Sequence, residues 1–172
     1  MELRFYPPTI FRETPKVKFF DAGIDLTNGC DVVMHSGEAI SPPDEYKFEQ
    51  YYVHNHQIDH NLVISGERKF ILINPTWEEP HHVIYLNRSM GALEIPIGTY
   101  HRSISGKGGS IVLNQPIRDR FFNPIKEFIP HKLNKLNLIK ARKSPPIYWI
   151  YENNKIKRFC FDPLKRKVKT RI

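Results

Sequence analysis

Short apolar runs separated by turn-forming residues constrain the fold of this 172-residue chain more than any other feature of its sequence. Fourteen prolines and nine glycines interrupt these runs, and before residue 130 no apolar pattern with helical spacing lasts for three turns. Many short strands with turn residues between them are typical of an antiparallel sandwich or barrel. We therefore predict an all-β fold. The expected strands cover residues 31–34, 50–56, 62–65, 69–74, 83–86, 92–96, 102–105 and 110–114.

The basic residues are concentrated near the C-terminal end. Residues 131–172 contain 13 of the 26 Lys and Arg residues but 2 of the 18 Asp and Glu residues, so the net charge of +8 arises there. We predict a β domain over residues 1–130 and a basic extension over 131–172 that packs on it. A short helix at 133–143 and a β-hairpin with its turn at Asn153-Asn154 would form this extension. A solvated surface explains the charge as well as contact with nucleic acid or a membrane does, and no nucleic-acid-binding signature supports such contact.

Composition narrows the class of protein further. Hydrophobic residues make up 40% of the chain, which is ordinary for one folded core. No apolar run approaches the roughly 20 residues of a membrane-spanning helix, and the N-terminal residues lack the apolar segment of a signal peptide. We expect a cytoplasmic protein in which Cys30 and Cys160 are reduced thiols.

Histidines cluster at two places in the sequence. His54, His56 and His60 lie within seven residues, and His101 ends a Pro-x-Gly-x-x-His sequence. If residues 50–56 form a strand, Tyr52, His54 and His56 project from the same face. Three imidazoles and one further donor would hold a divalent transition metal and leave an open coordination position. The alternative is that His54 and His56 face solvent while His101 caps a turn. The adjacent pair His81-His82 points to opposite strand faces and is expected in a loop or at the surface.

The spacing resembles the two motifs of the cupin superfamily. The first cupin motif is His-x-His, an acidic residue a few positions later and, after six more residues, Gly; it is matched by His54, His56, Asp59 and Gly66. The second motif, Pro-x-Gly-x-x-His, is matched by residues 96–101. The resemblance covers about residues 48–116. It implies a double-stranded β-helix, which is a jelly-roll β-barrel.

The resemblance also implies a ligand set for a metal. His54, His56 and His101 would be ligands of a divalent Fe, Mn, Ni or Zn ion. Two candidates remain for the fourth ligand. Counting back from the motif glycine selects Asp59, whereas counting forward from His56 selects His60, which keeps the usual spacing and is favoured for that reason.

Four polar side chains are expected in the same pocket as substrate-binding residues. Tyr52 shares the expected strand face of the first histidine pair, and Ser103 shares the face of the second-motif histidine. Asn114 lies at the end of the last expected strand, and Arg118 lies in the loop after it. For Arg118, an ordinary ion pair with Asp119 is the alternative role.

Three functions remain open from the sequence. The first is a metal-dependent enzyme, an oxygenase, isomerase or epimerase, that acts on a small carbonyl or sugar-like molecule through catalytic His54 and His101. The second follows from a similarity in layout to dTDP-4-keto-6-deoxysugar 3,5-epimerases and ketoisomerases. It implies a metal-free reaction in which His54 is the base, although the Lys of that family is replaced here by Asp59 or His60 and its Tyr has no counterpart.

The third function is a non-catalytic module that binds a small ligand. Because cupins commonly pair through their sheets, we also expect a homodimer. The aromatic hairpin over residues 147–161 is the expected exposed interface.

Overall fold

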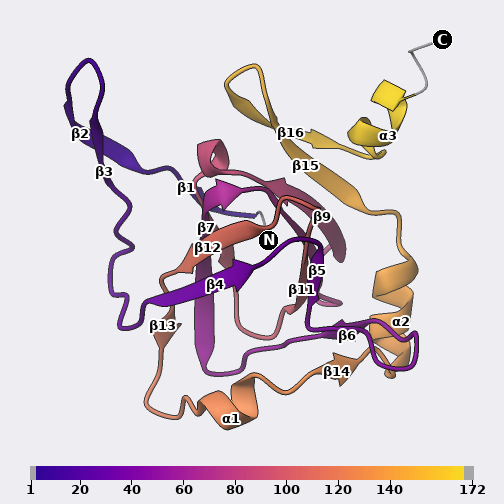
Figure 1. Cartoon of the computed structure of the whole chain (residues 1–172). Helices are drawn as coiled ribbons and strands as arrows, with labels where there is room; N and C mark the ends of the chain where they lie inside the picture. The colour runs from indigo at the N-terminus through magenta and orange to yellow at the C-terminus, as the bar shows by residue number, and fades with distance from the viewer. Residues whose placement is uncertain (1–2, 169–172) are drawn as a thin grey trace.

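The computed structural model describes residues 3–168, and most of its strands lie in two six-stranded sheets (Figure 1). The first sheet has at its centre β7 (Gln57–Gly66), which pairs with β10 (Ala92–Ile95) on one side and β12 (Ser110–Asn114) on the other. At its edges lie β1 (Phe5–Tyr6), next to β10, and β4 (Asp31–His35), next to β12, while the short β13 (Ile117–Arg118) continues from β12 along β7.

The second sheet contains four strands of the central chain and two strands of the C-terminal extension. Its order is β16 (Lys155–Phe159), β15 (Ile147–Glu152), β9 (His81–Leu86), β8 (Arg68–Ile73), β11 (Tyr100–Ser105) and β5 (Ala39–Ser41). All neighbours are antiparallel except β15, which runs parallel to β9. The strand-rich architecture confirms the all-β prediction.

The remaining elements lie around the two sheets. β6 (Gln50–Tyr51) pairs with β14 (His131–Lys132), and β2 (Thr9–Glu13) forms with β3 (Lys18–Asp21) an exposed hairpin that projects from the sheets (Figure 1). The helical segments are a 3-10 turn at Arg88–Met90, α1 (Pro124–Glu127), α2 (Leu136–Lys143) and α3 (Pro163–Val168). No helix within residues 3–168 has both the length and the apolar character needed to cross a membrane.

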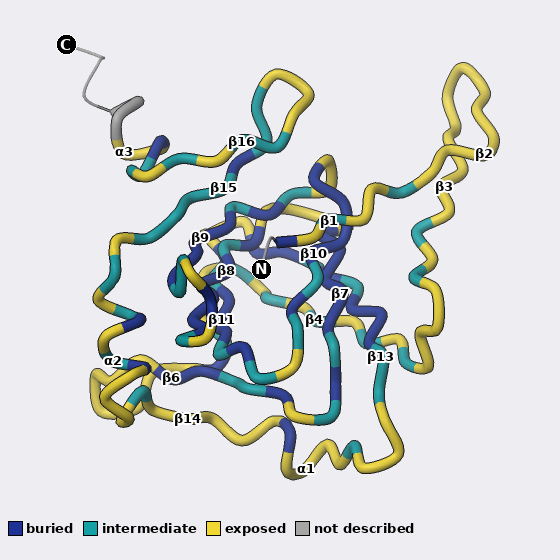
Figure 2. The backbone as a smooth tube through the Cα atoms, turned by 180° about the vertical axis from the view of Figure 1, so that it is seen from behind, coloured by how far each residue is buried: buried dark blue, intermediate teal, exposed yellow. Residues whose placement is uncertain are grey.

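The main core lies between the two sheets. Alternate residues of each strand point inward, so Val63 of β7 packs in one cluster with Phe70 and Leu72 of β8 and with Ile84 of β9. The same strands appear as the buried centre of the molecule in Figure 2. A second apolar cluster lies on the outer face of the second sheet, where α2 covers it with Leu138.

The expected strand over residues 50–56 is wrong in most of its length. Pairing stops after Tyr51, and Tyr52 makes only an isolated bridge with His101 through two backbone hydrogen bonds of 2.9 and 2.8 Å. The carbonyl of His54 then accepts a hydrogen bond from Gly98 N–H in a turn. Because the pairing with β11 is limited to one bridge and the next bond comes from the turn at Gly98, residues 53–56 do not alternate as in a strand, and β7 begins at Gln57.

The backbone conformation at the end of β7 requires Gly66, the glycine of the first cupin-like motif. Gly66 ends β7 with a φ of +73°, and a Cβ at this position would lie 2.5 Å from the carbonyl oxygen of Gly109. Only glycine adopts this conformation and permits this approach without strain. The turn fixes the register of β7 against β12.

The C-terminal extension contributes to the second sheet. Asn153 and Asn154 have φ angles of 54° and 60°, which confirms the predicted hairpin turn between β15 and β16. Trp149 of β15 is half-buried against the main core, and Ile150 is buried. The expectation that the hairpin presents an exposed aromatic surface is therefore corrected, because Trp149 and Tyr151 pack against the main core and Tyr148 packs against the second cluster.

The expected position of the histidine pair His81-His82 is also wrong. Both residues lie in β9 and are buried, where the sequence analysis expected a loop or the surface. His82 accepts a hydrogen bond of 3.0 Å from Trp149 Nε1, whereas His81 Nδ1 lies 3.0 Å from the carbonyl oxygen of Ser144. The two rings point to opposite sheet faces, as the strand period requires.

Candidate active site

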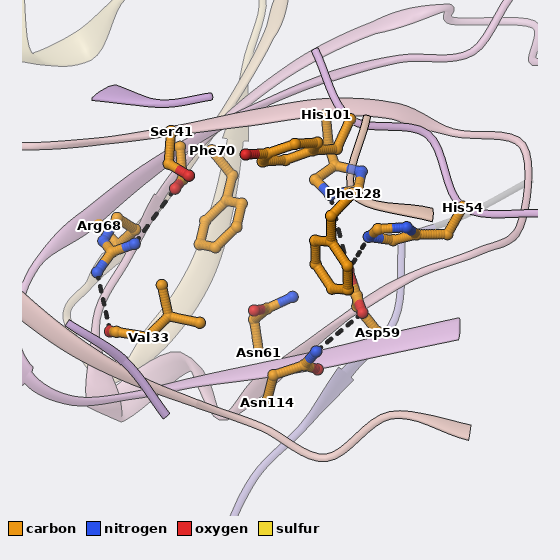
Figure 3. A pocket seen from close by; sticks show the side chains of 12 residues that line it. Val33, Ser41, His54, Asp59, Asn61, Arg68, Phe70, His101, Asn114 and Phe128 are labelled. Atoms are coloured by element: carbon orange, nitrogen blue, oxygen red, sulfur yellow. Dashed lines mark hydrogen bonds and ion pairs between the residues drawn. The ribbon is translucent and has the colours of Figure 1, made fainter. Parts of the chain in front are cut away.

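A cavity of about 220 Å³ opens between the two sheets (Figure 3). Its walls come from β4, β5, β7, β8, β11 and β12 and from the segments that precede β7 and follow α1. Two groups of polar side chains lie in it. His54, Asp59 and His101 are at one end, and Arg68 is at the other, next to Ser41.

The three groups at the first end converge on each other. Nε2 of His54 and Nε2 of His101 lie 3.5 and 3.7 Å from the same carboxylate oxygen, Oδ2 of Asp59. The two imidazole rings are 4.9 Å apart between their centres. All three residues are at most 7% exposed, so water screens their charges weakly. These are the only described residues whose His, Cys, Asp or Glu donor atoms group closely enough to hold a metal ion.

The other nitrogen of each imidazole faces an oxygen atom. Nδ1 of His101 lies 3.1 Å from the carbonyl oxygen of Thr99, which can only accept, so Nδ1 bears the hydrogen. Nδ1 of His54 lies 3.5 Å from Oε2 of Glu127, at the end of α1. Glu127 is 4% exposed and accepts a hydrogen bond of 2.8 Å from the backbone N–H of Asn55. His54 therefore lies between two buried carboxylates.

Asp59 is held in place by its second oxygen. Oδ1 accepts hydrogen bonds from Gln57 Nε2 at 2.6 Å and from Asn114 Nδ2 at 2.9 Å. Arg118 Nε in turn donates to Gln57 Oε1 at 2.7 Å. This network satisfies Oδ1 and leaves Oδ2 free to face the imidazoles.

The facing groups at this end of the cavity favour a positive charge near them. Burial, followed by the neighbouring His54, lowers the pKa of His101, which keeps this ring neutral near pH 7. Because its hydrogen is on Nδ1, His101 points a lone pair toward Asp59 Oδ2. This lone pair and the carboxylate repel each other, so this end of the cavity attracts a proton or a metal cation.

The structure does not bring His56 or His60 into this group. The side chain of His56 is 38% exposed, and its Nδ1 lies 2.9 Å from Asp119 Oδ2 outside the cavity. His60 follows Asp59 in β7 and so faces the opposite side, where its Nδ1 donates to the carbonyl of Gln115. These positions correct the expected placement of both histidines. Of the two candidates for the fourth ligand, Asp59 is the one in the cavity.

Three of the four expected substrate-binding residues line the cavity. They are Tyr52, Ser103 and Asn114. Arg118 does not line it, because its guanidinium pairs with Asp31 and bonds to Gln57. This corrects its expected role, since it orients a neighbour of Asp59 from outside.

Sequence reasoning missed two charged residues of the site. Glu127 had no signal, because it lies 26 positions after His101 in a short helix that belongs to no motif. Arg68 had a weak one: with Lys69 it begins the strand Arg68–Ile73, whose other four residues are apolar and typical of a buried strand.

Comparison with solved structures identifies the fold of this chain. No protein-family model matches the chain, and no curated protein matches its sequence. Among solved structures, the sugar 3,4-ketoisomerase QdtA of Thermoanaerobacterium thermosaccharolyticum, in complex with TDP, has a TM-score of 0.56 at 10% identity over 81% of this chain and 93% of that one.

Two epimerases resemble the chain to a similar degree. The 3'-monoepimerase ChmJ of Streptomyces bikiniensis, in complex with dTDP-quinovose, has a TM-score of 0.56 at 9% identity, over 88% of this chain and 80% of that one. The dTDP-4-dehydrorhamnose 3,5-epimerase of Elizabethkingia anophelis has a TM-score of 0.53 at 11% identity, over 88% and 93%. Likeness at this identity defines architecture, and a shared architecture does not fix a reaction. The chain therefore has the all-β jelly-roll fold of the cupins, in the layout of the dTDP-sugar epimerases.

Proposed function

We propose that this protein is an epimerase or isomerase that moves a proton at the carbon next to a carbonyl group in a small, sugar-like molecule. The main support is the position of His54, a buried imidazole between Asp59 and Glu127 on the wall of a cavity. A histidine has an ordinary pKa near neutrality and is the commonest general base. The sugar epimerases and ketoisomerases among the structural neighbours support the same class of reaction.

In the proposed reaction, Nε2 of His54 removes a proton from the carbon next to the carbonyl. The electron pair of the broken C–H bond forms the C=C bond of an enolate, and the carbonyl oxygen takes the negative charge. The imidazolium that results is stabilised by Asp59 and Glu127, which lie 3.5 Å from its two nitrogens. Addition of a proton from water to the opposite face, with loss of the imidazolium proton to water, inverts the carbon. If the carbon that loses the proton bears a hydroxyl group, an enediol forms, and return of the proton from His54 to the former carbonyl carbon isomerises the substrate.

In the proposed reaction, Tyr52 stabilises the enolate oxygen. Its ring stacks on that of His54 at 6.5 Å and lines the cavity, and among residues 3–168 its hydroxyl has no hydrogen-bond partner. A free hydroxyl beside the base can donate to the oxygen on which charge develops.

Deuterium exchange tests this proposal whichever product the reaction gives. The protein is incubated in D₂O with free ketoses and with dTDP-4-keto-6-deoxysugars, and loss of the α-proton signal is followed by NMR. We expect exchange that His54→Gln abolishes. The matched control is His56→Gln, which removes an exposed imidazole two residues away and leaves the rate unchanged. Absence of exchange with every substrate, or equal rates for the two variants, contradicts the proposal.

A second candidate, a metal-dependent enzyme, is supported by the donor set itself. His54, Asp59 and His101 each offer one ligand atom, and these atoms lie within 4.8 Å of each other. Thr99 and Glu127 lie at the Nδ1 atoms, as acceptors commonly do for metal-bound imidazoles. The donors fit a divalent Fe, Mn, Ni or Zn ion, and when bound such an ion polarises a substrate carbonyl.

Metal analysis distinguishes the two candidates. Elemental analysis of untagged protein is made on the wild type, on His101→Ala and on the control His56→Ala. About one transition metal per chain that is lost in His101→Ala alone supports the second candidate. Undiminished deuterium exchange after treatment with a chelator supports the first candidate and contradicts the second.

A further inference from the structure

Arg68, at the far end of the cavity, has no negatively charged partner. It is 1% exposed, and every contact of its guanidinium is with a neutral acceptor. Nε donates to Ser110 Oγ at 2.6 Å; one terminal nitrogen contacts His35 Nε2 and Ser103 Oγ at 3.1 and 3.2 Å; the other contacts two backbone carbonyls, of Val33 and Ser110. Within the described chain, no carboxylate forms an ion pair with it.

Another arginine, in the neighbouring strand, is buried to a similar degree but has charged partners. Arg102 of β11 is 2% exposed, but it pairs with Asp44 at 2.6 Å and lies 3.7 Å from Glu49. Buried charges in proteins are normally compensated in this way, because an unpaired ion in a weakly polar interior is strongly disfavoured. Arg68 departs from that rule, and it is the arginine that lines the cavity.

The charge of Arg68 is not cancelled by its surroundings. His35 accepts from Arg68 through Nε2, so its hydrogen lies on Nδ1, which donates to Ser105 Oγ. Burial and the nearby Arg68 lower the pKa of His35 to about 4, so this histidine is neutral near pH 7. Burial also lowers the pKa of Arg68 to about 10, which still leaves the guanidinium charged at neutral pH.

Hydrogen-bond donors are available beside this charge. Ser103 Oγ accepts from Arg68, so its own hydrogen is free to point into the cavity. Ser41 and Asn61 line the same space, and in the described structure their side chains have no hydrogen-bond partner. Figure 3 places Asn61 between the Arg68 end and the His54 end.

We propose that the Arg68 end of the cavity binds a carboxylate group, so that the ligand of this protein is a small organic acid with a carbonyl, such as a 2-oxo acid or a sugar acid. The carboxylate compensates Arg68 and accepts hydrogen bonds from Ser103, Ser41 and Asn61. Arg68 thereby acts as a specificity-determining residue. The orientation, with the carbonyl toward His54, rests on the proposed function, whereas binding of the carboxylate does not.

The size of the cavity agrees with a small acid. Its volume of about 220 Å³ is below the roughly 300–1,000 Å³ that pockets for drug-sized ligands occupy. The single positive charge of Arg68 also matches the single negative charge of a carboxylate better than the nearly double negative charge of a phosphate. A phosphate is nevertheless the other anion that the charge could attract, and the test includes it.

Titration of the full chain with charge-matched pairs tests the proposal. The probes are pyruvate against pyruvamide and glucuronate against glucuronamide, together with inorganic phosphate, each followed by calorimetry and by the NMR signals of the arginine Nε–H groups. We expect at least one acid to bind about tenfold or more tightly than its amide and to shift the Arg68 signal. Equal binding of acid and amide, no binding of either acid, or tighter binding of phosphate at Arg68 overturns the proposal.

Variants assign the effect to Arg68. Arg68→Gln is expected to remove the preference for the acid, whereas the control Arg102→Gln retains it because that charge is already paired. If Arg68→Gln does not fold, Ser103→Ala keeps the charge, loses one donor and is expected to weaken acid binding several-fold. Retention of the full preference in Arg68→Gln, or in Ser103→Ala, contradicts the proposal. Acid binding without deuterium exchange would support this inference and contradict the proposed function. Deuterium exchange with neutral sugars, without binding of either acid, would support the proposed function and contradict this inference.

Discussion

Asp59 and His60 are consecutive in β7, yet their side chains lie on opposite faces of the first sheet. Asp59 faces His54 and His101, whereas His60 Nε2 lies 3.6 Å from Glu94 on the other side. The strand thus separates two cavities, one of about 220 Å³ and one of about 240 Å³ beside Tyr6. A difference of one residue in register decides which side chain takes part in the proposed chemistry.

This relationship predicts unequal effects of two neighbouring substitutions. In Asp59→Asn the amide oxygen still accepts from Gln57 and Asn114, but the charge that stabilises the imidazolium of His54 is lost. We expect the deuterium exchange rate to fall by about 100-fold with little change in melting temperature. In His60→Gln the rate is expected to stay within about threefold of the wild type, because this side chain is outside the cavity. Equal losses in both variants would disprove the assignment.

Glu127 is expected to affect both stability and rate. It is buried, accepts hydrogen bonds from Asn55 and His56 N–H groups, and lies next to His54. Glu127→Ala leaves these donors without their partner, and we expect a loss of about 1–3 kcal/mol in urea denaturation. Glu127→Gln keeps an acceptor oxygen without the charge, so it should recover most of the stability while the exchange rate stays lowered. A rate that returns together with stability would show that the carboxylate acts only in folding.

His82 is expected to make the fold sensitive to acid. Burial, foremost among the causes, lowers its pKa to about 4, and Trp149 donates to its Nδ1, which requires the neutral ring. Because the pKa in the folded state is below the unfolded value of about 6.5, stability is complete above pH 6.5 and declines as pH falls from there toward 4. The contribution is on the order of 2–3 kcal/mol.

Urea denaturation at pH 7 and pH 5 checks this contribution. His82→Gln keeps an acceptor for Trp149 but does not titrate, so its stability is expected to change less between the two pH values than that of the wild type. His131→Gln, at an exposed position, is the control and should keep the wild-type pH dependence. An unchanged pH dependence in His82→Gln would show that other groups cause the acid sensitivity.

The two turns that meet beside β7 are expected to tolerate alanine differently. Gly66→Ala forces a side chain to a φ of +73° and into contact with the Gly109 carbonyl, whereas a Cβ on Gly106 meets nothing within 4 Å. We expect a loss of about 1–3 kcal/mol for Gly66→Ala and less than about 0.5 kcal/mol for Gly106→Ala. Thermal denaturation of the two variants measures the difference, and similar melting temperatures would refute it.

The homodimer stays a prediction, and the exposed apolar side chains now suggest where to test it. They include Phe11 and Phe19 on the β2–β3 hairpin, at 67% and 39% exposure, rather than the C-terminal hairpin. We expect sedimentation at twice the chain mass of 20.3 kDa, and a shift toward monomer in Phe11→Ser. Only monomer at about 50 µM would remove the prediction, since stable homodimers persist at such concentrations.

Local sequence rules were enough to predict the strand class, most strand positions and the Asn153-Asn154 turn, and the cupin-like motif spacing indicated His54 and His101 of the candidate site, with Asp59 as the less favoured of two alternatives. Strand alternation, turn propensity and motif spacing act over a few residues, which is why they can be read without the fold. The same rules placed Tyr52, Ser103 and Asn114 near the site. They failed at His56, where backbone bonds to a distant loop end the strand and remove the alternation on which its placement relied.

The choice between Asp59 and His60 required the three-dimensional arrangement, because the start of β7 depends on pairing with β10, β12 and β13 rather than on local spacing. The fold also brought in Glu127 and Arg68, whose importance comes from burial. A carboxylate and a guanidinium are ordinary surface groups in a sequence; they become strong electrostatic elements only when the fold removes them from water, and whether a partner lies nearby depends on segments far apart in the chain. For that reason the sequence indicated a histidine site, and the fold showed an uncompensated charge at the opposite end of the same cavity.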